Sequence, residues 1–214
     1  MKGLLLKDIF NLRKVAKQYL LILAFFVCYC FFLRNPSFFP MMTVMSFSMM
    51  ILTSLGYDEA AGFDKYALTL PVNREDLVRT KYLLLLLLIA AGFVVGMIGN
   101  ILINLFIQGD REPVLEQMIS VAAVAAVFFL VYATMLPLVF KLGVEKARMT
   151  LMVCYIAVFA GVFFAVKQIT KLGLDKKLTD GRMTALALAA AIGTILYFIG
   201  SYFVSVRIIR KREW

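Results

Sequence analysis

Long uncharged apolar runs, separated by short polar segments, dominate the sequence. Six such runs cover residues 18–33, 35–57, 82–107, 118–140, 149–166 and 183–206. A helix needs about 20 apolar residues to cross the hydrocarbon core of a bilayer, with a range of about 17–25. The first run is short, but Lys17 and Arg34 bracket it, and their long side chains can reach outward to the headgroups. The pattern predicts an all-α integral membrane protein with six transmembrane helices in a single domain, residues 1–214.

The composition agrees with this prediction. Hydrophobic residues make up 63% of the 214 residues and charged residues only 17%, against about 25% in a soluble domain. The mean hydropathy is +0.90. A chain of this length cannot hide so much apolar surface in one core, since most of a small protein stays at its surface. A soluble or disordered protein is therefore excluded.

Positive charges fix the expected orientation. The segments 1–17, 58–81, 141–148 and 207–214 carry 16 of the 23 Lys and Arg residues. Loops rich in Lys and Arg stay in the cytoplasm, so both termini are expected there. The segment 167–182 breaks the pattern, because it carries five positive residues on the expected outer side. The net charge of +10 then reflects topology and not a nucleic-acid partner, which would need a polar face to bind.

The N-terminal segment, residues 1–17, has helical periodicity. Leu5, Ile9 and Leu12 share one face, and Lys7 and Lys14 lie opposite. We expect an interfacial amphipathic helix with its apolar side at the acyl boundary and its lysines at anionic headgroups of the membrane lipid. The alternative is a basic leader that only sets the topology.

The connection between the second and third runs has an apolar stripe of its own. Phe63, Tyr66, Ala67 and Leu70 lie at i, i+3, i+4 and i+7 of a short helix predicted over residues 59–70. A solvated connector needs no such stripe. The stripe must be covered, either by the membrane surface or by a cytoplasmic partner, and its pattern does not choose between them.

The second half of this connection predicts a helix that enters the membrane. Pro71 ends the short helix. Asn73 is then a candidate N-cap, with Asp76 at the third helical position of an acidic capping box. From there the helix is expected to pass through Leu77 and Val78 into the third run.

The same connection resembles a known family. The residues that carry the resemblance are Glu59, Gly62, Leu68, Leu70, Pro71, Val72, Arg74, Leu77 and Lys81. Their order and spacing are similar to those of the loop between the second and third spans of type-2 ABC exporter permeases. The N-terminal amphipathic segment, the six runs and the length also match small bacterial permeases of that family, some of which export amphipathic peptides. Thr80 stands where the family usually has Gly, and Phe63-Asp64 replaces its Thr-Leu.

The resemblance implies a function and partners. In this family the loop helix is a coupling helix that contacts a separate ATP-binding cassette subunit, which binds ATP and Mg²⁺. The expected cassette-contacting residues are Asp58, Glu59, Gly62, Phe63, Asp64, Tyr66 and Leu70. A second permease copy or a paralogue would complete the path. The expected protein is an exporter subunit of the bacterial plasma membrane that moves an amphipathic peptide or lipid-like substrate.

The sequence lacks the residues for chemistry of its own. It has no phosphate-binding Gly-x-x-x-x-Gly-Lys-Ser/Thr motif and no His, and the six runs carry no charged residue. These absences argue against a nucleotidase, a metal enzyme, a lipid enzyme and an ion-coupled carrier. A membrane-embedded immunity or regulatory protein, which forms no path, is the main alternative to the exporter.

Two features inside the third run predict helix packing or function. Asn100 and Asn104 share one face, where they either bond between helices or line a translocation path. Gly92 and Gly96 form a small-residue face suited to close helix packing, as do Ala157, Gly161 and Ala165 in the fifth run.

Overall fold

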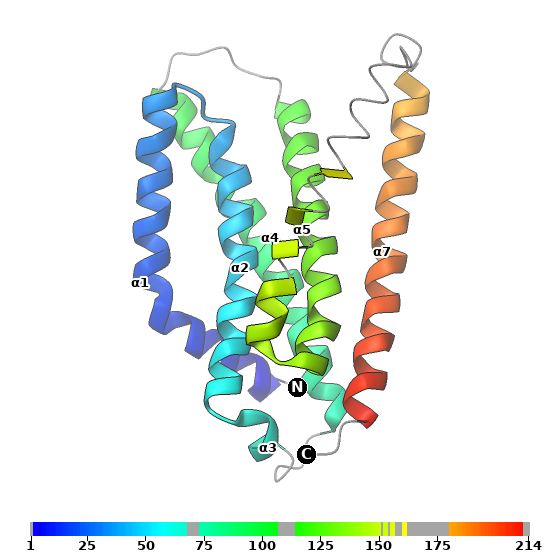
Figure 1. The fold of residues 1–214 in the computed structure, drawn as a ribbon. Helices are drawn as coiled ribbons and strands as arrows, with labels where there is room; N and C mark the ends of the chain where they lie inside the picture. Colours follow the sequence, from blue (N-terminus) through cyan, green and yellow to red (C-terminus); the bar gives the residue numbers. More distant parts are fainter. Residues whose placement is uncertain are drawn as a thin grey trace.

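The computed structural model describes residues 2–67, 73–106, 114–150, 152–153, 155–156, 160–161 and 180–211. These residues form a bundle of helices and include no strand (Figure 1). The named helices are α1 (Lys2–Leu33), α2 (Phe38–Ala60), α3 (Phe63–Ala67), α4 (Arg74–Phe106), α5 (Val114–Leu142) and α7 (Asp180–Lys211). Residues 144–150 are also helical. The all-α class predicted from the apolar runs is confirmed for this part of the chain.

Four helices are long and apolar enough to cross a membrane. They are Gly3–Leu33, Phe38–Ala60, Glu75–Phe106 and Leu115–Leu142, found in a search restricted to the described residues. Each contains one of the first four predicted runs, except that residues 35–37 of the second run and residue 107 of the third run lie outside these helices. The sixth run lies within α7. Most of the fifth run lies outside the described residues.

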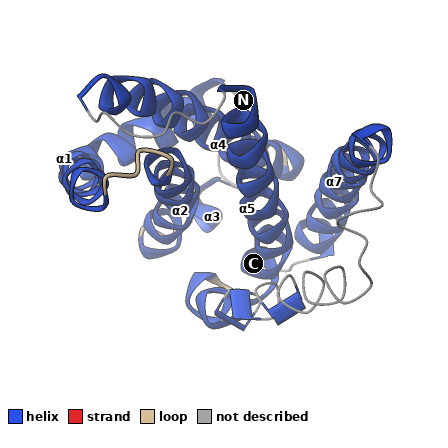
Figure 2. Cartoon of the chain, turned by 90° about the horizontal axis from the view of Figure 1, so that it is seen from above, coloured by secondary structure: helices blue, strands red, loops and turns tan. Residues whose placement is uncertain are grey.

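The helices lie side by side and several of them end together. Figure 1 shows the start of α1, the whole of α3 and the end of α7 at the same end of the bundle, here called the α3 end. Seen along the bundle in Figure 2, α1 and α7 lie on opposite sides, with α2, α4 and α5 between them. The main apolar core joins the C-terminal halves of α2 and α5 to the first half of α4, so it lies toward the α3 end.

The N-terminal segment is part of α1, which is helical without a break from Lys2 to Leu33. Figure 1 shows α1 bending at its foot, so that its first residues run beneath the bundle. Among residues 3–17, the buried positions are Leu4, Asp8, Leu12 and Val15. Ile9 of the predicted apolar face is exposed, and an acidic side chain, Asp8, lies on the side that packs against the bundle. The contacts of Asp8 are described below, and the interfacial position of the segment stays a prediction.

A tight turn connects the first two spans. α1 ends at Leu33 and α2 begins at Phe38. Arg34 has a positive φ of 53°, and the Ser37 N–H donates to Asn35 Oδ1 at 3.0 Å. An asparagine that accepts a bond two residues ahead is a common way to close such a turn.

The most extensive helix pairing joins α2 to α4, and glycines make it close. A Cβ at Gly92 would lie 2.9 Å from Phe47 Cβ, and one at Gly96 would lie 2.7 Å from Pro40 Cα. Ordinary side chains do not fit at such distances, so the small-residue face predicted for α4 is confirmed. In the fifth run only Gly161 of the corresponding set is described.

A proline in α5 creates a polar link to α7. Pro137 has no N–H, so the carbonyl of Ala133 loses its helical partner. The Ser201 hydroxyl of α7 donates to that carbonyl. The Tyr82 hydroxyl of α4 also lies 2.6 Å from Ser201 Oγ and 2.8 Å from Ser205 Oγ. Three helices thus meet at one buried set of hydroxyl groups.

We expect Gly96→Ala to destabilise the protein by about 1–3 kcal/mol, because the new methyl group must push the α2 backbone at Pro40 away. The matched control is Gly193→Ala in α7, where nothing lies within 4 Å of the added Cβ. That change should be neutral or slightly stabilising, since Ala favours helices over Gly. Thermal unfolding in one detergent compares the two, and equal midpoints would contradict the close packing.

Candidate functional site

The polar connection between α2 and α4 begins later than predicted. A new helix was expected at Glu59, but α2 itself continues to Ala60. The helix ends through bonds from the Ala61 N–H to the Tyr57 carbonyl and from the Gly62 N–H to the Glu59 carbonyl, both 3.0 Å. Gly62 has a φ of 59°, which a glycine adopts without strain.

The short helix that follows, α3, covers Phe63–Ala67. The part of the connection that contains Leu70 and Pro71 lies outside the described residues. The predicted start of the next helix is confirmed, because α4 begins at Arg74 directly after Asn73. The Asp76 N–H donates to the Asn73 carbonyl at 2.9 Å.

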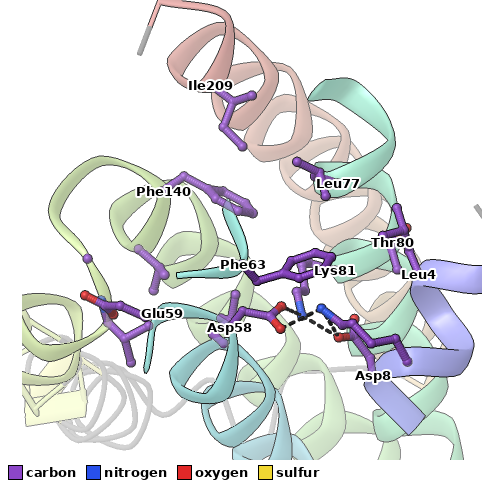
Figure 3. A pocket seen from close by; sticks show the side chains of 15 residues that line it. Leu4, Asp8, Asp58, Glu59, Phe63, Leu77, Thr80, Lys81, Phe140 and Ile209 are labelled. Atoms are coloured by element: carbon purple, nitrogen blue, oxygen red, sulfur yellow. Dashed lines mark hydrogen bonds and ion pairs between the residues drawn. The ribbon is translucent and has the colours of Figure 1, made fainter. Parts of the chain in front are cut away.

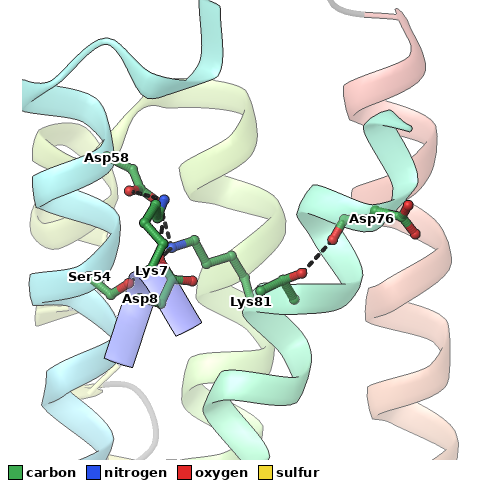
Figure 4. Close-up of polar contacts among 7 residues, drawn as sticks. Lys7, Asp8, Ser54, Asp58, Asp76 and Lys81 are labelled. Carbon is green, nitrogen blue, oxygen red and sulfur yellow. Dashed lines mark hydrogen bonds and ion pairs between the residues drawn. The ribbon is translucent and has the colours of Figure 1, made fainter. Parts of the chain in front are cut away.

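Two lysines and two aspartates meet beneath α3, and we call Lys7, Asp8, Asp58 and Lys81 the ion cluster (Figure 4). The Lys81 ammonium lies 2.5 Å from Asp58 Oδ2 and 2.9 Å from Asp8 Oδ1. The Lys7 ammonium lies 2.6 Å from Asp58 Oδ1 and 3.2 Å from Asp8 Oδ1. These residues come from α1, α2 and α4, so the cluster joins three helices.

Three of the four side chains in the ion cluster are almost fully buried. The exposed fraction is 1% for Asp8, 6% for Asp58 and 7% for Lys81. Two positive and two negative charges balance, which buried ions require because leaving water is costly for each of them. Lys81 also donates to Ser54 Oγ at 2.9 Å, so the three hydrogens of its ammonium each have an acceptor.

The ion cluster also supports α3. The Lys7 ammonium lies 3.4 Å from the centroid of the Phe63 ring, which is a cation–π contact. Figure 3 shows Phe63 lying over a small cavity of about 60 Å³, whose lining includes Asp8, Asp58, Lys81 and Phe140. α3 therefore packs against the ion cluster, which the N-terminal turns of α1 and the adjacent ends of α2 and α4 supply.

Glu59 connects α2 to the segment after α5. Its Oε2 atom accepts a hydrogen bond from the Val144 N–H at 2.6 Å. Gly143 has a φ of 85°, and a Cβ there would lie 2.8 Å from Glu59 Oε1. A carboxylate at the start of a helix is favourable because the first N–H groups have no partner within the helix. Glu59 thus stabilises the start of the helical residues 144–150.

The expected cassette-contacting residues do not share one surface. Asp58 and Phe63 point toward the ion cluster, and Glu59 points toward Val144. Ala67 is buried, whereas Tyr66 has an exposed fraction of 60%. Gly62 lies in the exposed turn before α3. The side chain of Asp64 is not described, and Leu70 lies outside the described residues.

The predicted asparagine pair joins two helices. Asn100 Nδ2 donates to Gln117 Oε1 of α5 at 2.6 Å, and Asn104 Nδ2 donates to Asn100 Oδ1 at 3.3 Å. Asn100 and Gln117 are both buried. Of the two interpretations, bonding between helices and lining of a translocation path, this geometry agrees with the first. Gln117 escaped notice in the sequence because it lies one residue before the fourth run.

The ion cluster as a unit does not follow from the sequence pattern. Asp8 was the available clue, because an acidic residue lies beside Leu12 and Val15 in an otherwise basic segment. Nothing in the local pattern indicates that Lys81, 73 residues farther along the chain, is its partner. In the described part of the chain no group of three His, Cys, Asp or Glu side chains could hold a metal ion.

The helices and their apolar surfaces define a multi-pass membrane protein. Residues 3–210 match the family model described as ABC-2 family transporter protein, so the chain belongs to that family. Comparisons with curated proteins and with solved structures gave no match. Family membership makes the chain a transporter permease subunit, not itself catalytic, and implies an ATP-binding cassette partner in general.

We expect Lys81→Met to destabilise the chain by about 3–5 kcal/mol, because it leaves two buried carboxylates with one lysine. The control is Lys14→Met, which removes an exposed lysine of α1. Thermal or denaturant unfolding in detergent measures both changes.

The double variant Asp8→Asn with Lys81→Met tests the electrostatic cause. It restores the charge balance of the ion cluster, so it should be more stable than Lys81→Met alone. A double variant that loses the sum of the two single effects would contradict the coupling between the two charges.

Proposed function

We propose that the chain is the permease subunit of an ATP-binding cassette exporter, with one transmembrane domain of six crossings. In this proposal α3 is the coupling helix, and it contacts a cassette subunit that binds ATP and Mg²⁺. The first turns of α1 lie at the membrane interface. A coupling helix must present one side to its partner and hold the other side firmly against the spans.

The two-sided placement of α3 is the observation that carries the proposal. Phe63 and Ala67 face inward, while Tyr66 is 60% exposed at the end of the bundle. Exposed aromatics of this kind are typical anchors of small protein interfaces. The inward side rests on Lys7, which pairs with Asp58 of α2. Asp8, the next residue of the ion cluster, pairs with Lys81 of α4. A displacement of Tyr66 would therefore be passed through the ion cluster to α1, α2 and α4.

The positions of the described helix ends support six crossings. Residues 144–150 lie beside Glu59 at the α3 end, and α7 begins at the opposite end of the bundle (Figure 1). One further crossing between them accounts for this arrangement. The segments at the α3 end also carry most of the Lys and Arg residues, which favours the cytoplasm for this end.

Cysteine labelling tests this orientation. In a background without Cys28, Cys30 and Cys154, cysteines replacing Lys65 and Lys176 should react with an impermeant reagent from opposite sides of the membrane. Lys176→Cys should label in intact cells, and Lys65→Cys only after the membrane is opened. Labelling of both in intact cells would rule out the proposed topology.

One chain offers one coupling helix, so a complete exporter needs a second permease copy or paralogue and two cassettes. The apolar, uncharged character of the six runs favours an amphipathic peptide or a lipid-like substrate of a bacterial plasma membrane. An amphipathic helical peptide should therefore stimulate ATP hydrolysis by the assembled complex, and a small charged solute should not. Absence of any cassette partner would instead favour the immunity or regulatory protein.

We expect Tyr66→Ala to weaken cassette binding by about 2 kcal/mol or more, as the loss of a central aromatic anchor does. Native mass measurement of the purified complex should show two permease chains with two cassettes for the unmodified protein. The Tyr66→Ala complex should lose its cassettes and keep its permease pair, because no span is altered.

The matched control is Tyr29→Ala, which removes a tyrosine exposed on α1 near the opposite end. Cassette retention in this variant should equal that of the unmodified protein. If Tyr66→Ala retains its cassettes equally well, α3 is not the docking helix, and coverage by the membrane surface becomes the better explanation of its apolar stripe.

A further inference from the structure

A second site lies between the adjacent ends of α4 and α7, away from α3 and the ion cluster. A hollow of about 310 Å³ opens there, and Figure 1 shows the two helix ends side by side. Its lining includes Glu75, Arg79, Tyr202, Phe203, Arg207 and Arg210. We call it the α4–α7 groove.

Positive charge exceeds negative charge in the α4–α7 groove. Glu75 pairs with Arg210 and, at 3.4 Å, with Arg79. Arg79 Nε donates to the Tyr202 hydroxyl at 2.9 Å. One carboxylate thus lies between two guanidinium groups, and the more distant Asp76 is 3.9 Å from Arg79.

Arg207 adds a third guanidinium to the groove. It is exposed and has no acidic partner among the residues that the structure describes. Each guanidinium offers five N–H donors in a fixed plane, a geometry that suits the oxygens of a phosphate group. The groove therefore has both the charge and the donors to hold an anion.

Apolar side chains rise from the charged mouth of the groove along both helices. On α4, Leu83 and Leu86 follow Arg79 at i+4 and i+7, and both are exposed. On α7, Phe203 and Ile199 precede Arg207 by four and eight residues, and both are exposed. A free phosphate would use only the mouth, whereas a lipid would also use these apolar walls.

We propose that the α4–α7 groove binds an anionic phospholipid, with the headgroup phosphate at Arg79 and Arg207 and an acyl chain along Phe203. Basic pockets between membrane helices at the cytoplasmic side hold acidic headgroups in this way. Topology alone requires positive residues at this end but does not require three arginines to line one hollow. Only the leaflet from which the lipid comes depends on the proposed orientation.

Lipid retention by the full chain tests the site. Purified protein is exchanged into detergent with phosphatidylglycerol or phosphatidylcholine and its bound lipid is counted by native mass measurement, without a cassette. Phosphatidylglycerol should be retained over phosphatidylcholine. Arg207→Gln should lower that retention about fivefold, and Arg207→Lys should lower it less, because it keeps the charge.

Arg13→Gln is the matched control, since it removes an exposed arginine of α1 outside the groove. Equal retention by Arg207→Gln and Arg13→Gln would overturn the proposal, as would equal binding of the two lipids. Displacement of the lipid by excess inorganic phosphate would identify an anion site without a lipid component and would also overturn it. Because the cassette is absent, none of these outcomes depends on the coupling function of α3.

Discussion

The ion cluster is the constraint on which the α3 end of the protein depends. Asp8, Asp58 and Lys81 are buried and Lys7 is partly exposed beside them, in a place where a charge without a partner is far more costly than in water. Removal of any one of them leaves the other three unbalanced. The first turns of α1 and the neighbouring ends of α2 and α4 therefore have to stay together, although they are far apart in the sequence.

The contacts between α2 and α4 differ in kind from the contacts that hold α7 in the bundle. α2 and α4 meet through the ion cluster at one end and through Gly92 and Gly96 farther along, so this pair is fixed over its length. Inside the bundle α7 is joined to α4 and α5 through hydroxyl groups, one of which satisfies the carbonyl freed by Pro137, and at the α3 end it is joined to α4 through the partly exposed pair Glu75–Arg210. Hydroxyl bonds of this kind exchange partners at lower cost than buried ions, since no charge is left alone. A rearrangement of the bundle is therefore easier at α7 than between α2 and α4.

Much of the fold follows from the sequence because it depends on local patterns. The apolar runs indicate helices, Arg34 to Pro36 indicate a tight turn, and Asn73 marks the start of α4. The buried face of α1 does not follow, because it depends on ion pairs between residues distant in the chain. Periodicity alone does not show that Asp8 and Asp58 are buried, because it contains no information on their distant partners. It groups Phe63 with Tyr66, whose rings do lie 6.3 Å apart, but it does not show that Lys7 lies over the Phe63 ring.

The small size of α3 links the ion cluster to the proposed docking surface. A helix of five residues has no stability of its own in water, so its neighbours must set its position. Phe63 over Lys7 and the buried Ala67 supply those contacts, and Tyr66, whose ring lies 6.3 Å from that of Phe63, stays 60% exposed beside them. Lys7 keeps its own position only because Asp8 and Asp58 hold it. The position of α3, and with it that of Tyr66, thus depends on the ion cluster, and in the proposed function a cassette bound at Tyr66 would contact a helix held by that cluster.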